Sequence, residues 1–188
     1  MLINARNQVF NSNANTETKV RGLCELVRDI LYKMTGSVDV ADFIKNERGS
    51  CTPKHVFLAQ NLQELGVPVK FLQIPFYYKD LEVTLPEDKL DLVAKVPLCM
   101  HTALKAKLSG EWVTIDVTWD SKLQGFPVNS DWDGHSNMKL AVVPHSITEL
   151  AVAPAEFTKE SLKYTEEEKE IKQEFYKFFD EFLIASRG

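Results

Sequence analysis

Apolar positions recur at helical spacing in the first part of the chain. Seven of them share one helical face: Val20, Leu23, Cys24, Val27, Ile30, Leu31 and Met34. This pattern predicts an amphipathic helix, for which Thr16 or Thr18 can serve as the cap and Gly36 as the end.

A second helix is predicted to begin at Ser50 and to end at Gly66. Its buried stripe consists of Val56, Ala59, Leu62 and Leu65. Pro53 is tolerated in the first turn, because the N–H that proline lacks has no helical partner there. Residues 38–45 can form a short helix, and residues 46–50 are expected to be the loop that leads into the second helix.

Strand patterns, rich in β-branched or aromatic residues or alternating in polarity, occupy four ranges: 67–78, 98–108, 112–119 and 138–144. The second and third of these flank Ser109-Gly110 and are expected to form an antiparallel hairpin. Residues 81–97 fit two interpretations, a short helix that begins at Pro86 or a loop.

The chain closes with an amphipathic segment at about residues 158–186. Its apolar face carries Ile171, Phe175, Phe178, Phe179 and Phe182. The opposite face is net acidic, which favours docking on the sheet or on a partner subunit over membrane binding. Together these elements predict a single α+β domain over residues 1–188, with a core at about 17–145 and the last helix as an extension.

Composition and charge narrow the class of protein. The 188 residues are 44% hydrophobic and 26% charged, with a formal net charge of −5, which argues against nucleic-acid binding. Residues 1–19 do not resemble a signal peptide and no apolar run reaches membrane-spanning length, so we expect a cytoplasmic protein. Cys24, Cys51 and Cys99 are expected to be free thiols, and no oligomeric state is predicted.

Three side chains carry the strongest candidate chemistry. Cys51 lies at the start of the second predicted helix, where unpaired N–H groups and the helix dipole favour a thiolate. His101 and Asp116 lie on the two strands of the predicted hairpin. A thiolate attacks a carbonyl, a histidine moves the proton, and an aspartate orients the imidazole and stabilises its cation. We therefore predict Cys51, His101 and Asp116 as catalytic residues.

The hairpin predicts how His101 and Asp116 meet. If residues 109–110 form a two-residue turn, His101 faces Thr118 and Ala103 faces Asp116. The two candidates are then diagonal neighbours on one face, with backbones about 7–8 Å apart, which their side chains can bridge. A three-residue turn would send Asp116 to the opposite face.

Longer motifs around these residues resemble the transglutaminase-like cysteine superfamily. The similar runs are Arg48-Gly49-Ser50-Cys51, Leu65-Gly66-Val67-Pro68-Val69 and, after His101, Glu111-Trp112-Val113-Thr114-Ile115-Asp116-Val117-Thr118. The resemblance covers about residues 20–118. It implies a papain-like α+β fold with a nucleophile helix packed on an antiparallel sheet, and a triad of Cys51, His101 and Asp116.

Two departures from the family pattern concern substrate choice. Ser50 stands where the family often has aspartate, and Thr102-Ala103 stand where it often has an aromatic residue. We expect acyl transfer or amide or peptide hydrolysis through a thioester, on a protein or peptide amide and without a cofactor. The alternative is a binding or scaffolding module that keeps the fold without turnover.

Further residues have candidate roles around this triad. Asn46 is a candidate oxyanion donor and Trp132 a candidate wall of a substrate groove. His55 is an alternative base one turn after Cys51, but it has no carboxylate three or four residues away. Cys24 and Cys99 are expected to fill the core.

The sequence predicts neither a calcium site nor a zinc site. Residues 129–134 match the first half of a calcium loop, but its twelfth position is Leu140 where a bidentate glutamate is required. A zinc site built from the three catalytic candidates lacks closely spaced ligand pairs.

Overall fold

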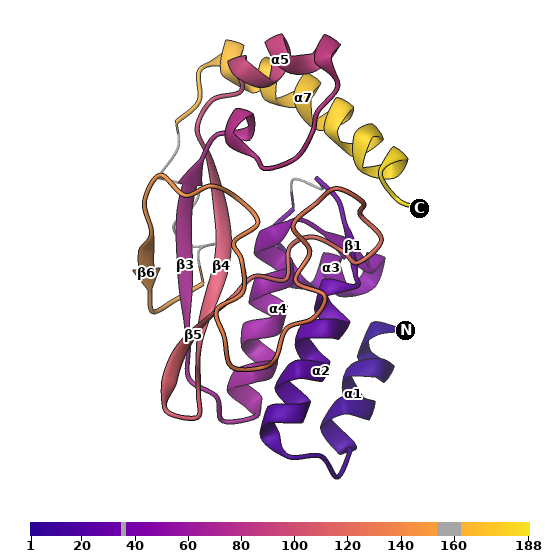
Figure 1. The fold of residues 1–188 in the computed structure, drawn as a ribbon, viewed down its shortest axis with the longest axis vertical. Coiled ribbons are helices and arrows are strands. Elements are labelled where there is room, and N and C mark those ends of the chain that lie inside the picture. Colours follow the sequence, from indigo (N-terminus) through magenta and orange to yellow (C-terminus); the bar gives the residue numbers. More distant parts are fainter. Residues whose placement is uncertain (35–36, 154–162) are drawn as a thin grey trace.

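The computed structural model describes residues 1–34, 37–153 and 163–188. A four-stranded antiparallel sheet carries helices on one face and a helical cap at one end (Figure 1). Its strand order is β5-β4-β3-β6, formed by β3 (Val69–Phe76), β4 (Cys99–Leu108), β5 (Glu111–Ile115) and β6 (Thr148–Leu150). The predicted α+β class is confirmed.

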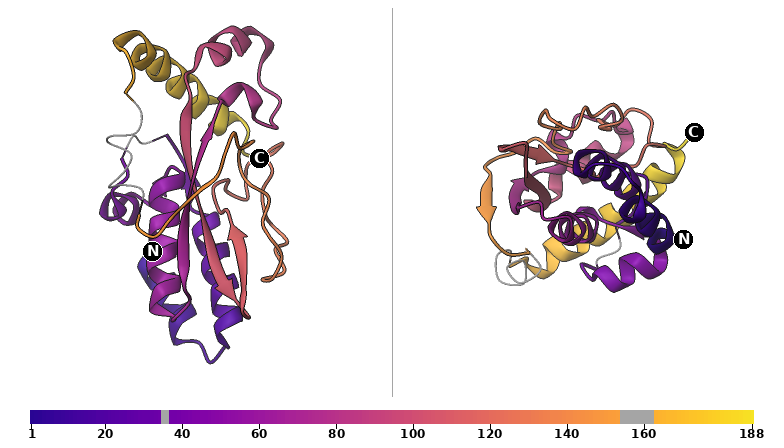
Figure 2. Two further views of the ribbon diagram at one scale, coloured as in Figure 1. Left: turned by 90° about the vertical axis from the view of Figure 1, so that its left-hand side faces the viewer. Right: turned by 90° about the horizontal axis from the view of Figure 1, so that it is seen from below.

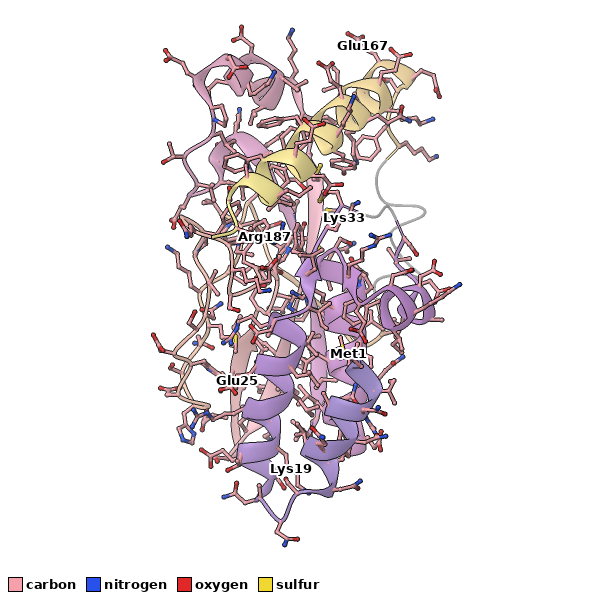
Figure 3. The ribbon with its side chains drawn as sticks, turned by 90° about the vertical axis from the view of Figure 1, so that its right-hand side faces the viewer. Met1, Lys19, Glu25, Lys33, Glu167 and Arg187 are labelled. Atoms are coloured by element: carbon pink, nitrogen blue, oxygen red, sulfur yellow. The ribbon has the colours of Figure 1, made fainter. Side chains whose placement is uncertain are left out.

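Three helices stack in order away from the sheet: α4 (Cys51–Glu64), α2 (Thr16–Arg28) and α1 (Leu2–Asn11). Figure 3 shows α1 and α2 in front, and Figure 1 shows α4 between α2 and the sheet. A short helix, α3 (Val40–Asn46), packs on α4. A parallel pair, β1 (Leu31–Tyr32) and β2 (Arg48–Gly49), lies just before α3 and α4 in the chain. The predicted nucleophile helix is therefore α4, and it packs on the sheet as expected.

The last helix, α7 (Glu166–Ala185), crosses one end of the sheet beside α5 (Leu90–Lys95) (Figure 2). Helix α5 and residues 163–188 are called the cap from here on. Two 3-10 turns, η1 (Tyr78–Asp80) and η2 (Glu87–Lys89), connect β3 to α5. The side chains of α7 that reach the core are Phe175, Phe179 and Leu183. The helix therefore docks on its own chain, which agrees with the first of the two predicted alternatives, the sheet or a partner subunit. Its predicted beginning at residues 158–162 lies outside the described residues.

Two apolar clusters make up the core. One lies between the helices and the sheet and includes Leu23, Leu58 and Leu104. The other lies at the end of the sheet that α7 covers, and it includes Cys51 and Trp119. The start of α4 therefore lies where the two clusters meet, with Cys51 facing the α7 side.

The predicted first helix is too long. Helix α2 ends at Arg28, and Leu31–Tyr32 form β1. Lys54, which is fully buried, donates from Nζ to the carbonyl oxygens of Arg28 (2.9 Å) and Ile30 (3.0 Å), so it satisfies the last carbonyl of the helix and one just beyond it. The apolar residues after Arg28 fit helical spacing but pack as extended chain. The predicted end at Gly36 lies outside the described residues.

Two other assignments were wrong or missed. Residues 138–144 are not a strand; they form an extended loop in which Met138 N donates to Thr114 O at 3.0 Å, and the sheet gains β6 in its place. Helix α1 was missed because its sequence is polar and only Leu2 is fully buried. The ambiguous segment 81–97 contains η2 and α5, in agreement with the helical interpretation.

Gly49, two residues before Cys51, lets the backbone pack closely against Phe43 and Pro53. A Cβ atom at this position would lie 2.8 Å from Phe43 Cδ2 and 3.0 Å from Pro53 Cγ. We expect Gly49→Ala to cost about 1–3 kcal/mol of unfolding free energy, because Phe43 is held in the core and overpacking is destabilising. Denaturant unfolding measures this. Gly22→Ala is the control, since its Cβ would meet nothing closer than 3.4 Å within a helix and is expected to be neutral or stabilising.

Candidate active site

The hairpin of β4 and β5 brings His101 and Asp116 together. Ser109 (φ 49°) and Gly110 (φ 93°) form the two-residue turn, both with positive φ as a type I′ turn requires. The pairing of Leu108 with Glu111 continues to Leu104 with Ile115, which is the predicted register. The ladder ends there, and Asp116 then turns so that its Oδ2 lies 2.8 Å from His101 Nε2.

Asp116 is held by several donors besides His101. Its Oδ1 accepts from the backbone N–H (3.1 Å) and the hydroxyl (2.6 Å) of Thr118, and its Oδ2 accepts from Ala141 N at 2.8 Å. Burial alone would raise the pKa of Asp116, but the His101 imidazolium and these hydrogen bonds hold the pKa well below its usual range. The carboxylate is therefore ionised and fixed in place.

His101 is cationic in this setting. Burial alone would lower its pKa, but the negative charges of Asp116 and Cys51 and the hydrogen bonds to both raise the pKa to about 10. Because Nε2 is bound to Asp116, Nδ1 is the ring nitrogen left for the sulfur.

Cys51 is the first residue of α4 and is 9% exposed. Its N-cap, Ser50, makes no side-chain capping bond, so the N–H groups of the first turn keep their capacity to donate. Burial alone would raise the pKa of Cys51, but the charge of His101, a hydrogen bond to it and the backbone N–H of Thr102 bring the pKa below the ordinary thiol value. These interactions favour a thiolate and imidazolium pair.

His55, the alternative base, is engaged elsewhere. Its Nδ1 donates to Cys51 O at 2.8 Å, and its Nε2 accepts from Val117 N at 3.1 Å, so neither nitrogen is free for a proton from the thiol. Burial lowers the pKa of His55 to about 4. These contacts indicate a neutral imidazole that links the start of α4 to the segment after β5.

Cys51 and His101 open into a cavity of about 240 Å³ between the sheet end, the start of α4 and the cap. Its walls are mostly apolar and aromatic, including Tyr32, Phe76, Tyr78, Trp119 and Val142, and three residues from the cap also line it: Tyr164, Lys172 and Tyr176. Figure 3 shows α7 running across this end from Glu167 to Arg187, with Lys33 beneath it.

Asn46 and Trp132 lie outside this cavity. Asn46 is exposed and its Nδ2 donates to Asp42 O at 2.9 Å. Trp132 packs against the helix-side core and its Nε1 donates to Ser136 O at 2.7 Å. The structure does not bring either to Cys51, because each belongs to a different surface.

Sequence reasoning missed several residues that shape the site. Tyr32 was assigned to a helix, and Lys172 was assigned to the polar face of α7, although both line the cavity. Ala141 N acts from the segment that was predicted as a strand, and Asn129 acts from the calcium-like loop before it: Asn129 Nδ2 donates to Asp116 O at 2.9 Å. Only the partial loop motif around Asn129 gave a signal. Cys99 lines the cavity, whereas Cys24 is buried in the other core cluster.

The calcium-like segment is used for loop hydrogen bonds. Asp133 Oδ1 accepts from the backbone N–H groups of His135 and Ser136, both at 2.8 Å. Within residues 1–34, 37–153 and 163–188, no group of three or more histidine, cysteine or acidic side chains is arranged to hold a metal ion. In the same ranges, none of the helices has the length and hydropathy needed to cross a bilayer.

No family model and no curated protein matches the chain. Among solved structures, one similar chain is described as a "putative cysteine protease" from Cytophaga hutchinsonii: TM-score 0.45, 14% identity, 78% of this chain and 41% of that chain covered. Another is a TGase, with TM-score 0.43, 14% identity, and coverage of 62% and 29%. This chain spans less than half the length of either one.

Proposed function

We propose that this chain performs cysteine-dependent acyl transfer or amide hydrolysis through a thioester on Cys51. The observation that carries the proposal is the buried contact of 2.8 Å between His101 Nε2 and Asp116 Oδ2, beside a cysteine at an uncapped helix start. A bound carboxylate keeps the imidazole charged and oriented, and the charged imidazole favours the thiolate.

The steps follow from these positions. The Cys51 thiolate attacks the substrate carbonyl, and the oxyanion that forms is stabilised by the N–H of Cys51 at the start of α4. His101 donates its Nδ1 proton to the leaving amine as the C–N bond breaks, which leaves a thioester. Water or a second amine then attacks the thioester, His101 takes the proton from the attacking group, and the thiolate is released.

The reactivity of Cys51 tests this proposal. Iodoacetamide is expected to alkylate Cys51 at pH 6 on the order of ten to one hundred times faster than a model thiol, because the thiolate is populated there although it is intrinsically less nucleophilic. Peptide mapping by mass spectrometry over time gives the rate at each cysteine. Cys51→Ala and His101→Ala should both abolish the fast phase.

A matched control and a turnover arm complete the experiment. Cys99→Ala should leave the fast phase intact, because burial raises the pKa of that thiol. With p-nitrophenyl acetate, we expect Cys51 to gain one acetyl group that water then removes, and the His101→Ala variant to lose this reaction. Alkylation of Cys51 no faster than of a model thiol would defeat the proposal. Fast alkylation without any acylation would favour the binding or scaffolding alternative.

A further inference from the structure

The cap contributes an amino group to the cavity of Cys51. Lys172, on α7, lines this cavity together with Tyr164 and Tyr176, on the side that the cap forms. Its Nζ lies 3.6 Å from the centroid of the Tyr164 ring and 5.6 Å from that of Tyr176, so two aromatic faces hold the ammonium. The lysine is partly buried and was not needed for the proposed chemistry.

Within the part of the chain that the structure describes, no carboxylate lies within ion-pair distance of Lys172. The nearest candidate in sequence, Glu168, is one turn away and accepts from Thr165 N at 2.7 Å in the capping box that starts α7. On the same helix, Lys169 pairs with Glu166 at 2.6 Å. Lys172 is thus a cation directed at a cavity while its helical neighbour is paired.

The described lining of the cavity has no carboxylate that would neutralise Lys172, and the Cys51 thiolate in the cavity is paired with the His101 imidazolium. Among the described lining residues there is no aspartate or glutamate. Burial raises the pKa of the adjacent Cys99 thiol, and the Lys172 ammonium offsets this only in part, so Cys99 is a neutral thiol. A partly desolvated cation among apolar walls gains from an incoming anion, because water no longer screens the pair fully.

Lys172 shares this cavity with the proposed reacting groups. Cys99, which lines the cavity with Lys172, precedes His101 by two residues on β4. A ligand that contacts Lys172 therefore lies in the same cavity as Cys51 and His101.

We propose that Lys172, held by Tyr164 and Tyr176, is a subsite for a carboxylate of the substrate, which makes the substrate an amide or peptide with an apolar body and a carboxylate that reaches the cap side of the cavity. This inference rests on the proposed function, because it names the substrate class for the same cavity. A carboxylate hydrogen-bonds and pairs with an ammonium, and the aromatic rings keep that ammonium in position. Lys172 is in this view a specificity-determining residue.

Paired alkylating reagents test the subsite. N-iodoacetyl derivatives of glycine, β-alanine and 4-aminobutyrate place a carboxylate at increasing distance from the reactive carbon, and their carboxamides are the neutral partners. We expect at least one acid to alkylate Cys51 about ten times faster than its amide. Ten-fold corresponds to about 1.4 kcal/mol, close to the lower end of the range for a hydrogen bond to a charged group.

Variants of α7 distinguish the effect of Lys172 from the overall electrostatic potential of the protein. Lys172→Met should bring the ratio of acid to amide rates down about ten-fold, and Lys172→Arg should retain most of it. Lys177→Met, which removes the same charge from an exposed position of the same helix, should leave the ratio unchanged. The His101 cation attracts every acid in all variants, so only the dependence on residue 172 reports the subsite.

A binding measurement keeps the test independent of reactivity. Calorimetry of Cys51→Ala with 3-phenylpropanoate and with 3-phenylpropanamide should show a preference for the acid that Lys172→Met removes. An acid preference that Lys172→Met leaves intact, or no acid preference in either experiment, would overturn the subsite while fast alkylation of Cys51 still supports the proposed function. Slow alkylation combined with the acid preference in calorimetry would instead defeat the thioester chemistry and leave the carboxylate site in place.

Discussion

Asp116→Ala is expected to lower the unfolding free energy by about 3–5 kcal/mol. The carboxylate is 2% exposed and accepts from His101, Ala141 and Thr118, so its removal leaves buried donors without acceptors and a buried cation without its counter-charge. Single domains are stable by about 5–15 kcal/mol, so this is a large share of the total. Urea unfolding of wild type and variant at pH 7 measures it.

The effect of Asp116 also has a definite pH dependence. Its pKa is lowered in the folded state, so the unfolded chain binds more protons and the contribution is present above the ordinary carboxyl pKa of about 3.9. It is lost as the pH falls below that value. The difference between wild type and Asp116→Ala should therefore shrink in acid.

Two further substitutions serve as controls for the effect of Asp116→Ala on stability. Asp131→Ala, at an exposed loop position, should change stability by less than about 0.5 kcal/mol. Asp116→Asn keeps the shape and one acceptor oxygen, so its loss should be smaller than that of alanine. A loss of less than about 1 kcal/mol for Asp116→Ala would show that this carboxylate does not organise the site.

Local patterns predicted the parts of the site that depend on short-range geometry. The two-residue turn at Ser109-Gly110 sets the register of the hairpin, and counting gave that register correctly as far as Leu104 and Ile115. The predicted pairing of Ala103 with Asp116 does not form, because β5 ends at Ile115, and Asp116 reaches His101 from just beyond the ladder. The position of Cys51 at a helix start followed in the same way from Ser50, Pro53 and the apolar stripe of α4.

Long-range contacts explain what the sequence could not predict. Lys54, assigned to no role, ends α2 from another helix by binding Arg28 O and Ile30 O, and its third bond, to Thr118 O at 2.8 Å, reaches the strand end beside Asp116. Helical periodicity continues past Arg28, and tertiary contacts, this one and the pairing of β1 with β2, end the helix there. The partners of Asp116 on the 129–141 loop likewise depend on how an irregular segment folds back.

The hydrophobic periodicity of the sequence also could not predict the contacts of the C-terminal residues with the segment next to the site. Arg187 pairs with Asp120 at 2.7 Å and donates to Tyr32 O at 2.9 Å, which ties the end of α7 to the segment next to the site. Met34 N donates to Asp180 on the same helix at 2.9 Å. Contacts between residues about 150 positions apart thus hold α7 against the segment that carries Tyr32 and Met34, which line the cavity. A pattern within one helix contains no information about such a partner.

The second large effect concerns the charge of His101. Its pKa is expected near 10, whereas the neighbouring His55, whose ring centroid is 6.1 Å away, is expected near 4. Two buried imidazoles in one site should thus have opposite charge states at pH 7. Asp116 and Cys51 both face His101 with negative charge and hydrogen-bond to it. Burial dominates at His55: both of its ring nitrogens are bound to backbone groups, and its longer contact with Asp116, 3.6 Å from Nε2 to Oδ1, does not offset the loss of solvent.

Removing the counter-charges should reverse the state of His101. In Asp116→Asn the main negative neighbour is gone and burial then favours the neutral ring, so the pKa of His101 should fall by several units. In Cys51→Ala the pKa should fall less, because Asp116 remains. His55 should stay neutral in both variants, and it serves as the internal control.

Long-range ¹H–¹⁵N correlation spectra of the histidine rings, recorded from pH 5 to pH 10, test the account most directly. At pH 7 the wild-type protein should show His101 with both ring nitrogens protonated and His55 as the neutral Nδ1–H tautomer. A neutral His101 at pH 7, or a cationic His55, would contradict the thiolate and imidazolium pair on which the proposed chemistry depends.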